Sequence, residues 1–370
     1  MGWYFSGHTG ELDVASPQTS ESTGSTESQG RKYFQCFWCR SGRTPNDSSE
    51  ADASCISVAD FVIDALHGVS QVCFFTNSVA GVVFLVAVLF GTPRQAVILG
   101  LLGVLVATAT SWCFSLDSAA RKDGTLGYNA MLVGCAFAFA VPYWWSVLAT
   151  LALASLSTFV AAGLLKIVSP QLTLAFNFSA LSTLAVIHLI DHGTATPAAI
   201  TWNNILPQLS TMDCVTAILN GVSQIFFVTS PISGCLILFG IGFAGPFMTF
   251  STLLGSTVAT LGAARCGADI SRFQQGIWGY NAALTALWIS FHFRSLGYVA
   301  VFFLVCFGAA AATAVFAGMD AVVAMTHGFA PTCFTLPFNA VGLSLVAIQR
   351  FIQGIHSLTK AKSSECTEQC

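Results

Sequence analysis

Two glutamines and two threonines stand at matching places in this chain, and the chemistry they offer is neutral hydrogen bonding. Gln71 and Gln224 each end a Gly-Val-Ser-Gln sequence, and Thr173 and Thr335 each precede Leu-Ala-Phe-Asn or Leu-Pro-Phe-Asn. A carboxamide offers donors and an acceptor, and a hydroxyl offers one donor and two acceptor lone pairs. In an apolar wall these groups replace the water that a small, neutral, planar solute loses. Ions are excluded there, because their desolvation costs far more free energy.

Two asparagines and two phenylalanines accompany these groups. Asn129 and Asn281 lie in Gly-Tyr-Asn-Ala sequences, and we expect their amides to satisfy the backbone of broken helices. Phe74 and Phe227 follow each glutamine by three residues, roughly one helical turn, so their rings either line a slot or pack in the core.

The three pairs of motifs recur in the same order. The second copies follow the first by 153 residues for Gly-Val-Ser-Gln, by 152 for Gly-Tyr-Asn-Ala and by 162 for the threonine motif. Matching landmarks in one order indicate an internal duplication. The first threonine motif has Ala175 where the second has Pro337, so we expect a weaker local break in the first half.

The composition of the chain indicates an integral membrane protein. Only 8% of its 370 residues are charged, 54% are hydrophobic and the mean hydropathy is +0.72. A soluble domain carries about a quarter charged residues. The 13 cysteines are mostly scattered singly through apolar segments, which is typical of a small apolar side chain. We expect no nucleic-acid partner, no metal and no cofactor.

Each half contains five apolar segments and one short, more polar segment. The short segments, about 61–75 and 214–228, fall below the roughly 20 apolar residues that a membrane span needs. A short polar helix in lipid must be surrounded by protein, so we interpret both as re-entrant pore helices. Because five is an odd number of crossings, the second copy must enter the membrane in the opposite orientation to the first. The expected fold class is therefore all-α integral membrane, with two inverted-topology repeats and ten spans in total.

Charge and composition suggest how the chain is divided between membrane and water. With a cytosolic N-terminus, eleven Lys and Arg residues fall inside and only Arg94, Arg265 and Arg272 fall outside, so we expect both termini in the cytosol of a multi-pass plasma-membrane protein. The expected segments are a disordered cytosolic tail (1–55), a first membrane repeat (56–190), an extracellular linker (191–212), a second membrane repeat (213–352) and a cytosolic C-terminal tail (353–370).

A few other residues could carry chemistry. Cys36 and Cys39 form a lone CxxC, for which incidental or palmitoylated cysteines are favoured over a zinc or redox site. Asp64 is interpreted as a partner of a helix dipole rather than an ion site. Asp320 and His327 are the remaining candidates for a titratable role.

The duplicated motifs resemble those of the urea transporter family. The resemblance rests on Gly-Val-Ser-Gln followed by Phe, on Gly-Tyr-Asn-Ala-x-Leu in each half and on Phe-Thr-Leu-Pro-Phe-Asn, and it runs from about Ala59 to Arg350. It implies passive, channel-like facilitated diffusion of urea through a pore within each protomer of a homotrimer in the lipid bilayer. The residues that it places along the pore are Gln71, Gln224, Thr173 and Thr335, with Phe74, Phe227, Leu132 and Leu284 shaping a flat slot.

Three alternatives stay open at this point. The first is a pore for a related small neutral solute, such as ammonia, another amide or water. The second is a urea transporter coupled to protons or sodium through Asp320 or Asp64. The third is a membrane receptor or enzyme, against which the sequence offers no carboxylate, Ser/His or metal constellation. We therefore expect a protein that is not an enzyme.

Overall fold

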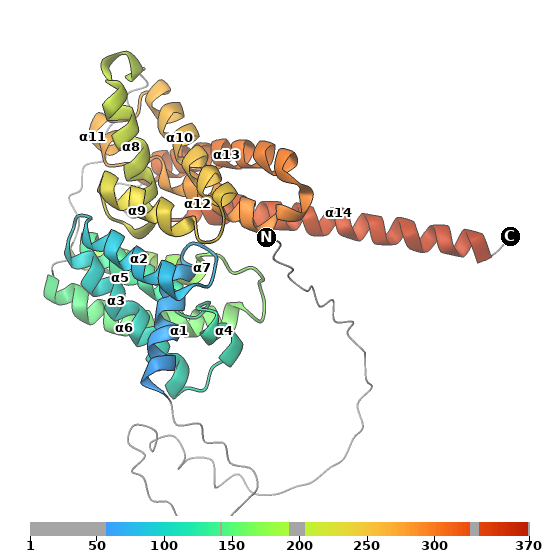
Figure 1. Ribbon diagram of the computed structural model, residues 1–370, viewed down its shortest axis with the longest axis horizontal. Coiled ribbons are helices and arrows are strands. Elements are labelled where there is room, and N and C mark those ends of the chain that lie inside the picture. The colour runs from blue at the N-terminus through green and yellow to red at the C-terminus, as the bar shows by residue number, and fades with distance from the viewer. Residues whose placement is uncertain (1–56, 141–142, 192–203, 326–332, 369–370) are drawn as a thin grey trace, which may run out of the picture. The chain divides into compact units, whose positions relative to one another are not determined.

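The computed structural model describes residues 57–140, 143–191, 204–325 and 333–368, all within one compact unit (Figure 1). In these ranges the regular structure is helical, apart from an isolated antiparallel bridge between Thr92 and Thr229. Cys36, Cys39 and His327, for which the sequence suggested roles, lie outside the described residues.

The first half of the described chain folds into α1 to α7. These helices are α1 (Val58–Gln71), α2 (Ser78–Leu89), α3 (Gln95–Cys113), α4 (Ser118–Lys122), α5 (Tyr128–Ala140), α6 (Tyr143–Leu164) and α7 (Leu174–Asp191). The second half contains α8 (Thr211–Ser223), α9 (Pro231–Ile241), α10 (Pro246–Arg265), α11 (Ile270–Gln274), α12 (Tyr280–His292), α13 (Tyr298–Met325) and α14 (Leu336–Glu368). Short 3-10 turns lie at Leu206–Gln208, Gln224–Phe226 and Arg294–Leu296.

Five of the described helices are long and apolar enough to cross a membrane. Their apolar stretches are Gln95–Cys113, Trp145–Leu164, Pro246–Arg265, Tyr298–Val322 and Leu336–Ile355. At 1.5 Å per residue, the 20 residues of α10 extend about 30 Å, which is the thickness of the hydrocarbon core of a bilayer. The chain is therefore a helical membrane protein.

Short helices in each half begin at a polar cap and end in a left-handed residue. Ser57 caps α1, and Ser210 and Asp213 form a reciprocal capping box at α8. Phe74, just past the end of α1, has φ 66°, and Phe227, just past α8 and its 3-10 turn, has φ 55°. A bulky residue in this region is strained, and here it turns the backbone sharply away from the helix.

Two glycine pairs bring these short helices against the helices that follow. A Cβ placed on Gly68 of α1 would lie 3.3 Å from Cα of Gly127, and one placed on Gly221 of α8 would lie 3.0 Å from Cα of Gly279. Any side chain at these crossings would force the backbones apart. The glycines of the two duplicated motifs therefore allow each short helix to pack closely against the helix that follows, because the two glycines of each pair lie against each other.

Contacts of α2 with α9 and with the 3-10 turn Gln224–Phe226 join the two halves. The rings of Phe84 and Phe226 lie 5.5 Å apart, and the hydroxyl of Ser233 donates to the carbonyl oxygen of Ala87 at 2.7 Å. At the end of α2, the Thr229 N–H donates to the carbonyl oxygen of Thr92 at 2.9 Å. The core is therefore shared between residues that lie about 140 positions apart in the sequence.

Candidate functional site

The two threonines of the duplicated motif meet at the starts of α7 and α14. Thr173 and Thr335 directly precede these helices, and their hydroxyl oxygens lie 2.7 Å apart although 162 residues separate them in the chain. Both side chains are buried. We call this contact the threonine neck.

A sharp backbone turn places each threonine. The preceding residues, Leu172 and Phe334, have φ 46° and φ 43°. Their carbonyl oxygens accept hydrogen bonds from the hydroxyls of Tyr128 and Tyr280, respectively. The expectation of a weaker break beside Ala175 was wrong. The first half turns as sharply as the second, because tertiary hydrogen bonds hold the turn whether or not a proline follows.

Two asparagines that the sequence analysis did not assign complete the neck. The Nδ2 group of Asn177 donates to the carbonyl oxygen of Thr173 and to the hydroxyl of Thr335, both at 2.8 Å. Oδ1 of Asn339 accepts from the Thr173 N–H at 3.0 Å and from its hydroxyl at 3.2 Å. Backbone groups have only one polarity, so these bonds determine which end of each amide is nitrogen. The repeated Phe-Asn that ends both motifs was the available sequence signal.

Oδ1 of Asn339 can only accept, so Thr173 can give its hydroxyl hydrogen to Asn339 while Thr335 gives its own to the oxygen of Thr173. In this arrangement both hydroxyl hydrogens are engaged. The Thr173 oxygen accepts from Thr335 and, at 3.4 Å, from Asn177, whereas the Thr335 oxygen accepts from Asn177 and retains one lone pair. Toward a solute, the neck then offers the Thr335 oxygen as an acceptor and suits a molecule that carries N–H groups.

Aromatic rings from both halves pack on either side of the neck. The Phe74 ring lies 5.6 Å from that of Phe338, and the Phe227 ring lies 5.4 Å from that of Phe176. Each ring at the end of a short helix thus meets a ring from the opposite half. A further ring, Phe334, lies 5.7 Å from Phe227, whereas the corresponding residue in the other half is Leu172, so the two sides of the neck differ.

The two glutamines lie at the ends of the short helices and bond to loops there. Gln224 is buried, and its Nε2 donates to the Thr229 hydroxyl at 2.8 Å and to the carbonyl oxygen of Gln275 at 3.1 Å. Gln71 is half-buried, and its Oε1 accepts from the Thr76 hydroxyl at 3.4 Å. None of these bonds reaches the threonine neck, so the glutamines form two separate polar stations.

The remaining predicted residues lie in the helices that surround the neck. Leu132 on α5 and Leu284 on α12 are buried in the same core as Phe74 and Phe227. The expectation for the asparagines of the Gly-Tyr-Asn-Ala motifs is confirmed. Oδ1 of Asn129 accepts from the backbone N–H of Phe176 at 3.1 Å, and Oδ1 of Asn281 accepts from that of Phe338 at 3.2 Å.

The carboxylates considered for ion coupling are paired with arginines. Asp64, which was interpreted as a helix-dipole partner, instead accepts a hydrogen bond from Nε of Arg121 at 2.9 Å in a buried ion pair. Asp320 forms two bonds with the guanidinium of Arg272, at 2.6 and 2.8 Å. Each of these carboxylates therefore already has a basic partner within the chain.

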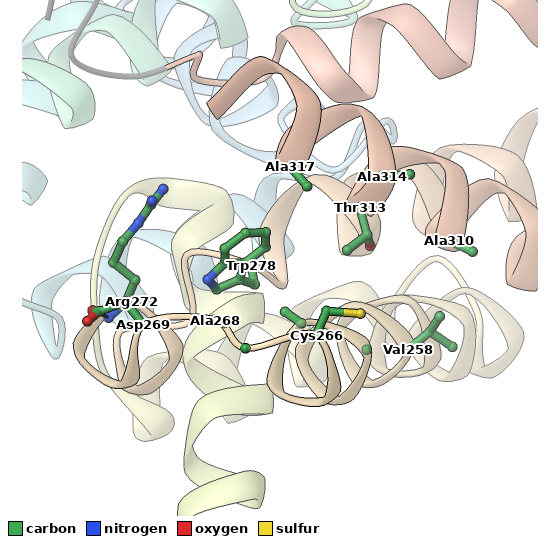
Figure 2. Close-up of a pocket in the computed structure, with 13 residues that line it drawn as sticks. Val258, Cys266, Ala268, Asp269, Arg272, Trp278, Ala310, Thr313, Ala314 and Ala317 are labelled. Atoms are coloured by element: carbon green, nitrogen blue, oxygen red, sulfur yellow. Dashed lines mark hydrogen bonds between the residues drawn. The ribbon is translucent and has the colours of Figure 1, made fainter. Parts of the chain in front are cut away.

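A cavity of about 320 Å³ lies away from the threonine neck, between α10, α11 and α13 (Figure 2). It is lined mainly by apolar side chains, with Arg272 and Asp269 at one end. None of the predicted pore residues lines it. It therefore differs in place and in chemistry from the buried constellation of threonine and asparagine.

The fold and the site together define a class of protein. Helices long enough to span a membrane enclose neutral hydrogen-bonding groups and aromatic rings at the starts of two helices, so the class is that of helical membrane proteins with a buried, uncharged polar centre.

Comparison with known proteins gives the family. A model of the urea transporter family matches residues 63–350. Urea transporter 1 of Ovis aries is 28% identical over 248 residues, which cover 64% of this chain and 64% of that protein. Urea transporter 1 of Mus musculus is also 28% identical, over 251 residues and 65% of each chain. The matched segment of the chain spans less than two thirds of the length of these relatives. Because the family model matches residues 63–350, the chain belongs to the urea transporter family.

Proposed function

We propose that this protein mediates passive, channel-like diffusion of urea across a membrane through a path within each protomer. The observation that carries the proposal is the threonine neck, where two buried hydroxyls from the two halves lie 2.7 Å apart and the Thr335 oxygen can accept from a solute. Urea donates four N–H groups from one plane, so it can bond the Thr335 oxygen of the neck while its faces pass the rings of Phe74 and Phe227. Leu132 and Leu284 complete the apolar walls.

The proposed path has three polar stations. Gln71 and Gln224 receive the solute at the two ends, and the threonine neck lies between them. Amides at the mouths can donate to the urea oxygen and accept from its N–H groups, and at the neck the Thr335 oxygen can accept from an N–H group. A cation would lose its hydration shell among the surrounding apolar residues, which raises its barrier far above that of a neutral amide.

The proposed architecture is an inverted pair of repeats, each with five spans and one re-entrant pore helix, so that α1 and α8 enter the membrane without crossing it. Their 14 and 13 residues are too few to cross, which supports this assignment. The paired contacts described above also support it, because Tyr128 bonds Leu172 as Tyr280 bonds Phe334. Duplicated halves that meet at mid-membrane place a solute site at their interface.

The remaining proposals concern the surroundings of the path. They place the protein in the plasma membrane as a homotrimer with both termini in the cytosol. The segments proposed are the cytosolic tail 1–55, the first repeat 56–190, the extracellular linker 191–212, the second repeat 213–352 and the cytosolic tail 353–370. Family membership supports the trimer, and the distribution of lysine and arginine supports the orientation.

Urea entry into proteoliposomes that contain the purified protein tests the function. We expect the initial rate to rise linearly with urea concentration and to be independent of sodium and of a pH gradient, because nothing is coupled to passage. Stopped-flow light scattering measures the rate, and empty liposomes supply the baseline. Liposomes no leakier than this baseline would contradict the proposal, and a requirement for an ion gradient would favour the coupled alternative.

Gln224→Leu is expected to lower urea permeability about tenfold, and Gln71→Leu by less. Gln224 is buried and bonds both Thr229 and the Gln275 carbonyl, so its loss leaves buried polar groups unpaired as well as removing a solute contact. Gln275→Leu is a matched control, since its backbone carbonyl and not its side chain meets Gln224. Equal permeability of wild type and Gln224→Leu would remove Gln224 from the path.

A further inference from the structure

The cavity between α10 and α13 opens on the outside of the helix bundle. Gly262 and Cys266 at the end of α10, and Ala310 and Ala314 on α13, line it and are exposed. Figure 2 shows α13 running over one side of the cavity and the end of α10 below it. Both helices are long and apolar enough to span a membrane, so the cavity faces lipid.

Two clusters of buried alanines show which residues correspond in the two halves. One cluster joins Ala107, Ala130 and Ala154, and the other joins Ala259, Ala282 and Ala309. Residues of α10 therefore follow their counterparts on α3 by 152 positions, and residues of α13 follow those on α6 by 155.

In the first half, two phenylalanines occupy the space that is hollow in the second. Phe114 and Phe159 form an edge-to-face pair with ring centroids 4.9 Å apart. Their counterparts are Cys266 and Ala314, which both line the cavity. Phe114 and Cys266 are also the C-terminal caps of their helices, which supports the correspondence.

A second pair of residues is also larger in the first half than in the second. The hydroxyls of Thr110 and Ser155 bond each other at 3.1 Å in the first half. Their counterparts are Gly262 and Ala310, which also line the cavity and carry no polar side-chain atom. The second half has therefore lost two rings and two hydroxyls from one place, so a guest can enter where the first half is closed by its own side chains.

The cavity also offers one buried hydrogen-bond donor. Trp278 is 7% exposed, and its indole nitrogen has no hydrogen-bond partner within the described part of the chain. Figure 2 shows the indole projecting into the space between Arg272, Cys266 and Thr313. A buried N–H without an acceptor is unfavourable, so the site is suited to a guest that brings one. The counterpart of Trp278 in the first half is Leu126, which has no donor.

The charges at the polar end of the cavity favour a neutral guest. The guanidinium of Arg272 is neutralised by its two bonds to Asp320, and the exposed Asp269 adds a negative charge. An anionic group would be repelled by Asp269 without an unpaired cation to compensate.

We propose that this cavity binds a glycerolipid of the bilayer. The acyl chain lies between α10 and α13 in the place of the Phe114 and Phe159 rings, and an ester carbonyl accepts the hydrogen bond of the Trp278 indole. Tryptophan is enriched at the membrane–water interface, where its ring lies in apolar surroundings and its N–H meets the polar region of the lipids. The proposal rests on the correspondence of the two halves and is independent of urea as the solute.

Native mass spectrometry of the purified full chain tests the proposal with two defined phosphatidylcholines, a diester and its diether analogue. The wild type is expected to retain the diester about fivefold more strongly, because the ether lacks the carbonyl acceptor. Trp278→Phe keeps an aromatic wall without the N–H, so the preference for the diester disappears. The double variant Cys266→Phe with Ala314→Phe fills the cavity as the first half does and retains one lipid fewer per protomer.

Two further measurements separate this site from general lipid contact. The double variant Phe114→Cys with Phe159→Ala opens a matching space without an indole N–H, because Leu126 stands in the place of Trp278, so it is expected to retain an additional lipid with no preference for the ester. Urea flux is expected to be unchanged in the filled variant. Equal lipid retention by the wild type and the filled variant would overturn the proposal, and so would displacement of the diester by a sterol.

Discussion

Thr335→Val is expected to lower urea permeability by about thirtyfold, the equivalent of about 2 kcal/mol. Valine has nearly the same shape as threonine, so the packing is kept while the hydroxyl is lost. The change removes one acceptor from the path and leaves the Asn177 amide without one of its bonds. Thr173→Val acts in the same direction and also leaves Asn339 without its hydroxyl partner. Stopped-flow measurements of urea entry into proteoliposomes give the permeability of each variant.

Two control variants make the result specific to the neck. Thr335→Ser keeps the hydroxyl and is expected to remain within a few-fold of the wild type. Thr285→Val removes another fully buried hydroxyl, which bonds only the Asn281 carbonyl of its own helix in the described contacts, and it is expected to leave urea entry unchanged. Wild-type rates in both neck valine variants would exclude the threonines from the path even if urea flux itself is confirmed.

Arg121→Met is expected to destabilise the protein by about 3–5 kcal/mol. Arg121 and Asp64 are both at least nine-tenths buried, and their ion pair joins α4 to the short helix α1. The guanidinium also lies over the Trp112 ring, 3.7 Å from its centroid. Removal of the cation leaves the Asp64 carboxylate buried without its partner, which is the costly outcome for a buried charge. Thermal unfolding of the purified protein measures the effect.

The second half of the chain supplies the matched control for this prediction. Its counterparts of Asp64 and Arg121 are Ala217 and Phe273, which pack together in a small apolar cluster. The double variant Asp64→Ala with Arg121→Phe copies that solution, and it is expected to be about as stable as the wild type, because an apolar pair avoids the desolvation of two charges. A double variant less stable than Arg121→Met alone would refute this explanation.

The helical segments were predictable because each is a local pattern. The apolar residues from about 95 to 114 form one stretch along the chain, and α3 runs from Gln95 to Cys113. Those from about 246 to 264 form another, and α10 runs from Pro246 to Arg265. Length, hydropathy and helix caps are properties of neighbouring residues, so these segments are found without knowing what they pack against.

The polar partners could not be predicted in the same way. Asn339 acts through Thr173, which lies 166 residues before it, and Arg121 pairs with an aspartate 57 residues earlier. Nothing in a local motif says which face of a helix meets which distant residue. The same holds for the lipid-facing cavity, since Gly262 and Ala314 are ordinary small residues until α10 and α13 are packed side by side.

The sequence by itself determined that this is a helical membrane protein, that its motifs are duplicated and that it resembles the urea transporter family, because composition, local pattern and repetition are all written along the chain. Only the tertiary structure decided which groups meet at the threonine neck and how the cavity differs from its filled counterpart. The physical reason is that a hydrogen bond or a hollow is made by atoms from several segments at once, and their positions are set by packing.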